Sequence, residues 1–93
     1  MCIVNIRDIL SSHANLPDAG VELYNIIVCA ISSDDKVVAN IEGVTSLPSI
    51  FLNVSLGKII DDYDIETLKK HISFSNITRS QAERLKDYLI RYN

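Results

Sequence analysis

The chain has 93 residues, which is enough for one small domain (residues 1–93) and leaves no room for a second independent core. Apolar residues make up 47% of it and charged residues 23%, a balance that excludes a disordered chain and predicts a compact globular domain. The net charge is −3, and Lys and Arg are scattered along the chain, which argues against nucleic acid as a partner.

The sequence gives no sign of a membrane segment or of a redox or metal site. Its longest apolar runs, such as NIIVCAI, are far shorter than the roughly 20 residues of a membrane span, and its amino terminus lacks the pattern of a signal peptide. We therefore expect a cytoplasmic protein that does not bind membranes. Cys2 and Cys29 lack CxxC spacing, so we expect free and mostly buried thiols.

The first half of the chain predicts two strands and one helix. Residues 2–6 (CIVNI) form a β-branched run that is typical of a strand, and residues 7–20, with Pro17 among several turn residues, predict an irregular segment. Apolar residues recur every three or four positions over 20–31, which indicates an amphipathic helix. Residues 36–44 are nearly continuously apolar, as in a buried central strand.

The second half predicts a long helix, a short helix, a strand and a final helix. The apolar stripe of residues 49–63 indicates the long helix, and residues 64–71 allow a short helical turn capped by their first residue. Alternation over 71–76 favours a half-buried or edge strand. Thr78 and Gln81 form a capping box for the last helix, whose apolar face contains Leu85, Tyr88, Leu89 and Tyr92.

The order of these elements is strand, helix, strand, helix, strand, helix. Such alternation requires a mainly parallel sheet, and right-handed crossovers then pack the helices against it. We therefore expect an α/β fold with a small, mainly parallel sheet.

Few residues of the chain are suited to catalysis. There are two histidines and three glycines, without a G-x-S-x-G motif or a glycine-rich phosphate loop. Acid-base chemistry also needs an oriented partner, so we interpret His71 as a solvated or strand-edge side chain, and we assign no catalytic role to His13, which lies in the irregular segment. Residues 61–64 (DDYD) fit a solvated helix corner better than a metal site, which needs more oxygen ligands. We expect no enzyme, no metal and no cofactor.

The most informative stretch is VTSLPSIFLN, residues 44–53, where the predicted central strand ends and the predicted long helix begins. In open α/β sheets, ligands and partners meet the protein at such a junction. Ser49 has two interpretations. It is either an ordinary helix cap or a hydroxyl displayed for modification, because a phosphate is stabilised at a helix amino terminus.

A stripe of small and polar residues begins at this serine. Ser49, Asn53 and Gly57 are four residues apart and therefore share one helix face. A glycine costs a helix roughly 1 kcal/mol relative to alanine, which is easier to understand if another group approaches the backbone at Gly57. That group belongs either to the protein itself or to another protein.

The segment VVANIEGVTSLPSIFLNVSLGKII resembles, without a gap, the centre of a STAS domain, the fold of bacterial anti-sigma-factor antagonists. It resembles the small STAS-like family of unknown function more closely, and this resemblance covers the chain from Val37 to its end. In the antagonists a GHKL-type kinase, which is also the anti-sigma factor, phosphorylates the serine that corresponds to Ser49. Three features depart from their pattern: Pro48 replaces an acidic residue, Ile50 and Phe51 replace small residues, and the amino-terminal strands are reduced.

The resemblance implies a non-enzymatic regulatory domain that binds a GHKL-type ATPase, an anti-sigma factor or a similar regulator. The implied contact surface is residues 45–57, with Ser49 as the phosphoacceptor. The partner-binding residues within it are Thr45, Ser46, Pro48, Ile50, Asn53 and Gly57. Two alternatives stay open: a constitutive binding or assembly module without phosphorylation, and a nucleotide-binding STAS-like domain.

Overall fold

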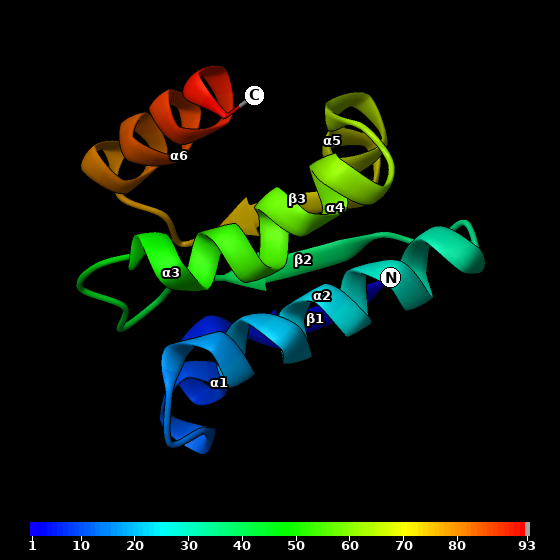
Figure 1. Ribbon diagram of the computed structural model, residues 1–93. Coiled ribbons are helices and arrows are strands. Elements are labelled where there is room, and N and C mark those ends of the chain that lie inside the picture. The colour runs from blue at the N-terminus through cyan, green and yellow to red at the C-terminus, as the bar shows by residue number, and fades with distance from the viewer. Residues whose placement is uncertain (93) are drawn as a thin grey trace.

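Three parallel strands form the sheet of the computed structural model, which describes residues 1–92 (Figure 1). They lie in the order β1–β2–β3, and β2 pairs with both neighbours. The bounds are Cys2–Asn5 for β1, Val37–Asn40 for β2 and Ile72–Ser75 for β3. The prediction of an α/β fold with a small parallel sheet is confirmed.

The helices gather on one face of this sheet. Successive right-handed crossovers between strands in the order 1-2-3 place all connecting helices on the same side. Figure 1 shows the helices of residues 16–32 and 49–62 in front of the strands. Their bounds are Ile6–Ser12 (α1), Leu16–Ser32 (α2), Ser49–Leu52 (α3), Asn53–Gly57 (η1, a π-helical turn), Lys58–Asp62 (α4), Ile65–His71 (α5) and Arg79–Arg91 (α6). Because α3, η1 and α4 follow one another without a break, they form one helix over residues 49–62, called the long helix below.

Two helix starts follow the sequence signals closely. Asp64 caps α5, and its carboxylate accepts a hydrogen bond from the backbone N–H of Thr67 at 2.6 Å. Hydrogen bonding from the side chain of Thr67, together with this backbone bond, lowers the pKa of the Asp64 carboxyl group. The capping box of Thr78 and Gln81 opens α6, with both reciprocal hydrogen bonds formed. These caps are local, which is why the sequence predicts them well.

The prediction of an irregular segment over residues 7–20 is wrong. This part of the chain contains α1 and the start of α2. Ile6 and Ile9 are buried one helical turn apart, so their burial on the same side stabilises α1 as a helix. Pro17 lies in the first turn of α2, where its missing N–H does no harm, and Asn15 caps that helix by accepting a hydrogen bond from Asp18 N at 2.9 Å.

The two cysteines are free, as expected, but they are exposed and not buried. Cys2 lies on the edge strand β1, and Cys29 lies on the outer side of α2. Both line one shallow pocket of about 220 Å³. The expectation of burial fails because an edge strand and the outer side of a helix leave these side chains in contact with solvent.

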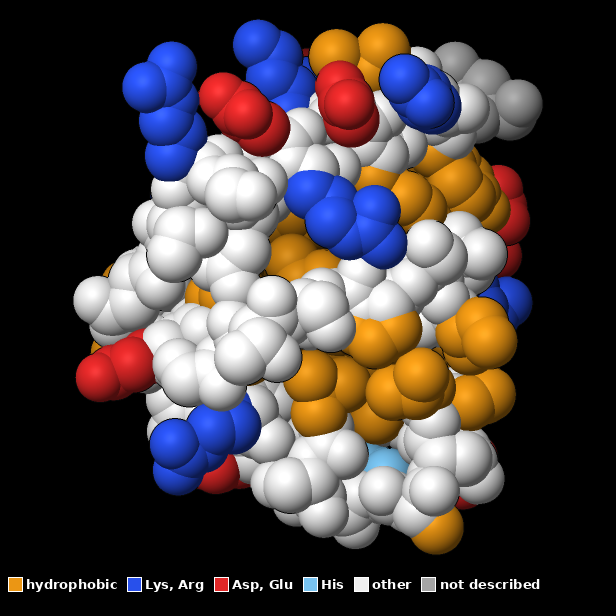
Figure 2. Space-filling view, turned by 90° about the vertical axis from the view of Figure 1, so that its left-hand side faces the viewer, with side chains coloured by type: hydrophobic (Ala, Val, Ile, Leu, Met, Phe, Trp, Pro, Cys, Tyr) orange, Lys and Arg blue, Asp and Glu red, His pale blue; other side chains and the backbone are white. Residues whose placement is uncertain are grey.

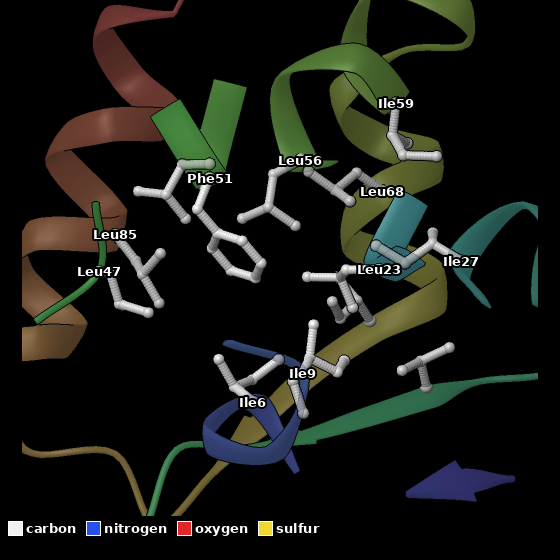
Figure 3. Close-up of a cluster of buried hydrophobic side chains, with 14 of the residues drawn as sticks. Ile6, Ile9, Leu23, Ile27, Leu47, Phe51, Leu56, Ile59, Leu68 and Leu85 are labelled. Atoms are coloured by element: carbon white, nitrogen blue, oxygen red, sulfur yellow. The ribbon is translucent and has the colours of Figure 1, made fainter. Parts of the chain in front are cut away.

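The core lies between the sheet and the helix layer. Val37 and Ala39 are fully buried beneath the helices. Figure 3 shows Phe51 of the long helix among side chains from α1, α2 and α6. The labelled members of this cluster are Ile6, Ile9, Leu23, Ile27, Leu47, Phe51, Leu56, Ile59, Leu68 and Leu85. The long helix is therefore fixed on the sheet by its inner face, which determines where its outer residues lie.

The second face of the sheet carries no helix. Side chains alternate along a strand, so Ile3, Val38 and Ser73, which share one register row, point away from the helix layer. Ile3 is 64% exposed. Parallel sheets usually carry helices on both faces, whereas this sheet carries helices on one face only. Within residues 1–92, no helix combines the length and the apolar character needed to cross a bilayer.

Gly20 sets the spacing between α2 and the long helix. A Cβ atom at this position would lie 2.8 Å from Val54 Cβ and 3.0 Å from the carbonyl oxygen of Phe51. Neither atom is the end of a flexible side chain, so a methyl group would push the two helices apart.

We expect Gly20→Ala to lower the free energy of unfolding by about 1–3 kcal/mol, because overpacking at this contact outweighs the helix propensity of alanine. Urea unfolding followed by circular dichroism would measure the change. Asn25→Ala, at an exposed position of the same helix, is the control and should change it by less than about 0.5 kcal/mol. Equal stability of Gly20→Ala and the wild type would contradict the close contact.

Candidate functional site

The candidate site is the junction between β2 and the long helix. The connecting loop, residues 41–48, turns at Gly43, whose φ of 81° favours glycine. Val44 N donates to the carbonyl of Ile41 at 3.0 Å, and the buried Leu47 anchors the loop in the core. The loop therefore delivers Ser49 to the start of the helix at a fixed position.

Ser49 does not cap this helix. The capping position belongs to Pro48, which has extended backbone angles and offers no side-chain hydrogen bond. Its carbonyl accepts the first helical bond, from Leu52 N at 3.1 Å. The interpretation of Ser49 as an ordinary helix cap is therefore wrong. Instead, its hydroxyl oxygen accepts a hydrogen bond from Arg84 Nη2 at 3.2 Å.

The first turns of α6 hold the loop that leads to Ser49. The guanidinium group of Arg84 also donates to the carbonyl of Leu47, from Nε at 3.1 Å and from Nη2 at 2.6 Å. Gln81 Nε2 donates to the carbonyl of Val44 at 2.5 Å. These bonds satisfy backbone carbonyls of the loop, so α6 and the loop position each other.

Farther along, α6 covers the stripe that begins at Ser49. Tyr88 donates its hydroxyl to Asn53 Oδ1 at 2.7 Å. A Cβ atom at Gly57 would lie 2.8 Å from the Tyr88 hydroxyl and 2.8 Å from the ring of Tyr92. The group that approaches Gly57 therefore belongs to the protein itself, namely to its last helix, and not to another protein.

The contact between the two helices is a matched pair of rows. Ser49, Asn53, Gly57 and Asp61 recur every four residues on the long helix, and Arg84, Tyr88 and Tyr92 recur every four residues on α6. The last pair is the hydrogen bond from the Tyr92 hydroxyl to Asp61 Oδ2 at 2.8 Å. We call this contact the α6 seam. It is formed mainly by the ends of polar side chains, and Leu85 is the one buried residue of α6.

A π-helical turn lies under the middle of the seam. Ser55 is fully buried, and its hydroxyl donates to the carbonyl of Phe51 at 2.7 Å. A hydroxyl that bonds back to this carbonyl competes with the regular backbone bond, and Ser55 lies within the π-helical turn itself. The turn changes the winding of the long helix between Asn53 and Gly57, and it thereby helps set the direction of the stripe.

The predicted contact residues differ in accessibility. Gly57 is buried beneath the seam, and Pro48 is half-buried. Exposed members of the set are Thr45, Ser46, Ser49, Ile50 and Asn53. Figure 2 shows the side of the molecule where the loop lies: charged side chains follow its upper border, and apolar side chains gather in its middle and lower right. A partner on this side would meet the loop and the first turn of the long helix, whereas Gly57 is covered by α6.

The histidines have ordinary structural partners. His71 is buried at the end of α5, not solvated, and its Nδ1 lies 2.9 Å from the carbonyl of Thr67. His13 pairs with Glu22 of α2. Neither lies at the candidate site.

The carboxylates of residues 61–64 face different partners. Asp61 accepts from Tyr92, Asp62 accepts from Tyr24 at 2.5 Å, and Asp64 caps α5. Among residues 1–92, no three His, Cys, Asp or Glu side chains are grouped so that they could hold a metal ion. This part of the chain serves to connect helices.

Sequence reasoning missed Arg84, Tyr88 and Tyr92 as parts of the site. Their four-residue spacing, matched by that of Ser49, Asn53 and Gly57, was the available signal. Two helices with complementary rows at the same spacing can pack side by side, but the spacing alone does not say which pair of helices meets.

The seam shifts the titration of its tyrosines. Burial, together with the charges of Tyr92 and Asp61, raises the pKa of Tyr88 to about 12. The hydrogen bond to Asp61 raises the pKa of Tyr92. In both cases the folded chain favours the neutral phenol.

Stability should therefore fall at alkaline pH. A raised folded-state pKa stabilises the fold fully below the ordinary tyrosine value of 10.0, and this contribution is lost as pH rises through the folded-state value of about 12 for Tyr88. We expect the urea midpoint to drop across this range and to drop less in Tyr88→Phe, which keeps the ring and removes the titrating hydroxyl. An unchanged slope in Tyr88→Phe would contradict the role of Tyr88.

Gly57→Ala tests the seam directly. The added methyl group meets the ends of the Tyr88 and Tyr92 side chains, which must swing aside and weaken their hydrogen bonds to Asn53 and Asp61, so we expect α6 to be held less firmly while the sheet stays folded. Hydrogen exchange read by mass spectrometry should show amides of residues 79–91 exchanging at least about 10-fold faster. Lys58→Ala, at the neighbouring exposed position, should leave this rate unchanged. Equal protection of α6 in Gly57→Ala would show that the seam does not hold it.

Comparison with known proteins agrees with the resemblance noted in the sequence. The model of one protein family, described as "STAS-like domain of unknown function (DUF4325)", matches residues 19–82. The searches of curated proteins and of solved structures found no match. The matched part contains β2, the long helix, α5 and β3, and it ends within the first turns of α6. Because it spans more than half of the chain, the protein belongs to this family of STAS-like domains.

Proposed function

We propose that this protein is a non-enzymatic regulatory domain that binds a partner protein through the junction between β2 and the long helix. The partner is an ATPase of the GHKL type or a similar regulator, as the resemblance to anti-sigma-factor antagonists implies. Phosphorylation of Ser49 switches the contact. The accessible binding residues are Thr45, Ser46, Ile50 and Asn53, around Ser49.

The observation that carries this proposal is the environment of Ser49. Its side chain is exposed at the first turn of a helix, and its hydroxyl is bonded to Arg84 and not used for capping. An exposed hydroxyl can enter the active site of a kinase. A cationic guanidinium group at 3.2 Å and the unpaired N–H groups of the helix start would both stabilise a phosphate there.

Ile50 gives this surface an apolar component. Its side chain is 53% exposed directly beside Ser49. A partner that covers the neutral serine and this isoleucine buries apolar area, which favours binding. Thr45 and Ser46 provide hydroxyl groups at the border of the same surface, where hydrogen bonds to a partner fix orientation.

Phosphorylation would oppose this contact. In the transfer, Ser49 Oγ bonds to the γ-phosphorus of ATP held by the partner, ADP leaves, and the hydroxyl proton passes to a base of the partner. The product carries about −1.5 to −2 charge at neutral pH. Burying that charge against the partner is costly, and Arg84 stabilises it in the free protein. Both effects shift the balance toward release.

Incubation of the full chain with each GHKL-type ATPase of its genome, with ATP and Mg²⁺, tests the proposal. Intact-mass analysis should show a species heavier by about 80 Da, the mass of one phosphoryl group, with one of these ATPases. Ser49→Ala should abolish this species. The same ATPase should bind the unmodified chain, and Ser49→Asp should weaken binding by at least about 10-fold.

Pro48 favours a second candidate, a constitutive binding module, because it stands where the antagonists carry an acidic residue. This candidate predicts binding without any mass change and equal affinity of Ser49→Asp and wild type. Ser33→Ala, which removes an exposed serine hydroxyl before β2 and therefore at the other end of that strand from the junction, serves as the control for loss of a hydroxyl. Binding to none of the ATPases would exclude both candidates as stated.

A further inference from the structure

A second surface lies on the neighbouring flank of α6, away from the seam. It is an open groove of about 510 Å³ between α5 and α6, with β3 beneath it. Figure 1 shows these two helices on either side of β3. Ile65 and Lys69 of α5 form one wall, Phe74 of β3 lies at the base, and residues 82–90 of α6 form the other wall. The groove shares no predicted contact residue with the junction.

The groove is apolar apart from one cation on each wall. Its two charged lining residues are Lys69, from α5, and Lys86, from α6. Both side chains are exposed, and neither forms an ion pair within the described residues 1–92. The remaining lining residues are apolar, so the surface pairs an apolar floor with two unneutralised positive charges.

Several of these apolar residues are left partly open to solvent. Ile90 is 66% exposed, and Ile65, Phe74, Ile77 and Leu89 are half-buried around it. A contiguous apolar surface of this kind, bordered by polar groups, marks an interaction site more often than singly scattered apolar side chains do. Covering it would remove apolar area from water.

The positive charge of the groove favours an acidic occupant. The chain as a whole carries −3, so two cations facing each other across an apolar floor oppose the overall sign. The net charge of the chain repels an acidic partner and these two lysines attract it locally, whereas a basic partner would be repelled by Lys69 and Lys86. The aliphatic stems of both lysines can extend the apolar floor while their ammonium groups meet carboxylates.

The shape of the groove favours a helix. Its α6 wall runs from Ala82 to Ile90, about 12 Å along the helix axis, which corresponds to roughly two helical turns. An amphipathic helix presents apolar side chains at i, i+3, i+4 and i+7 over that length, and grooves between helices bind such segments. We propose that this groove binds an amphipathic helix of an acidic partner protein, with its apolar face on Phe74 and Leu89 and its carboxylates at Lys69 and Lys86.

Selection from a phage-displayed library tests this proposal. The library holds helical peptides with leucine fixed at i, i+3, i+4 and i+7 and with all other positions random, and the bait is the full wild-type chain. We expect Asp and Glu to be enriched at the positions that border the leucines. Fluorescence anisotropy of the strongest peptide should show binding that weakens as salt is raised.

Charge reversal and truncation in the groove should reduce this binding. We expect the double variant Lys69→Glu with Lys86→Glu, and separately Ile90→Ser, to weaken the peptide by at least about 10-fold. The matched controls are Lys36→Glu with Lys70→Glu, which changes the charge equally at exposed lysines outside the groove, and Ile3→Ser, which truncates an isoleucine of similar exposure (64% against 66%). Both controls should bind as the wild type does.

Other outcomes would overturn the proposal. Failure to select any peptide, selection of basic or uncharged peptides, or equal binding by the groove variants would each do so. Sedimentation of the wild type as a dimer that Ile90→Ser dissociates would assign the groove to a second copy instead. Retention by phosphatidylglycerol vesicles, lost in the double lysine variant, would assign it to an anionic lipid surface.

Discussion

All the connecting helices of this chain have to fit on one face of a sheet that is three strands wide. The close approach of α2 to the long helix at Gly20 makes this possible. Because glycine has no Cβ atom, the backbone of α2 can pack directly against the side chain of Val54 and the carbonyl group of Phe51. With this spacing, Phe51 fills the centre of the core, and the outer face of the long helix turns toward solvent at the edge of the helix layer. That outer face carries the stripe that α6 then covers.

The role of α6 follows from what it buries. It contributes one buried residue, Leu85, and packs the partly buried Tyr88 and Leu89 against the core, whereas it contacts the long helix and the loop through hydroxyl, amide and guanidinium groups. Such contacts contribute about 0.5–1.5 kcal/mol each, so they orient a helix more than they fix it. The functional proposals place one partner at the junction and another in the groove, on two flanks of this helix. A displacement of α6 would change both surfaces together.

The sequence predicts those parts of the fold that depend on local signals. The parallel sheet follows from the alternation of elements, and the caps at Asp64 and Thr78 involve residues within one helical turn. The irregular segment over residues 7–20 was the main error, because Pro17 and its polar neighbours are read as breakers. The burial of Ile6 and Ile9, which makes α1 a helix, depends on residues distant in the chain.

The candidate site shows the same limit. The spacing of Ser49, Asn53 and Gly57 identifies a special face of the long helix, but it does not say what covers it. Periodicity places Tyr88 and Tyr92 on the apolar face of α6 and gives no indication that their hydroxyls meet Asn53 and Asp61. Only the packing of helices separated by more than 30 residues determines these pairs.

The π-helical turn at residues 53–57 has a consequence for how this arrangement could arise in evolution. A π-turn corresponds to one extra residue in an α-helix. Loss of that residue would rotate everything after it by about 100° relative to the first turn, since an α-helix has 3.6 residues per turn. Gly57 and Asp61 would then face away from Tyr92, although Ser49 would keep its place beside Arg84. A single insertion or deletion in this turn would therefore be enough to decide whether the last helix covers the stripe or leaves it open.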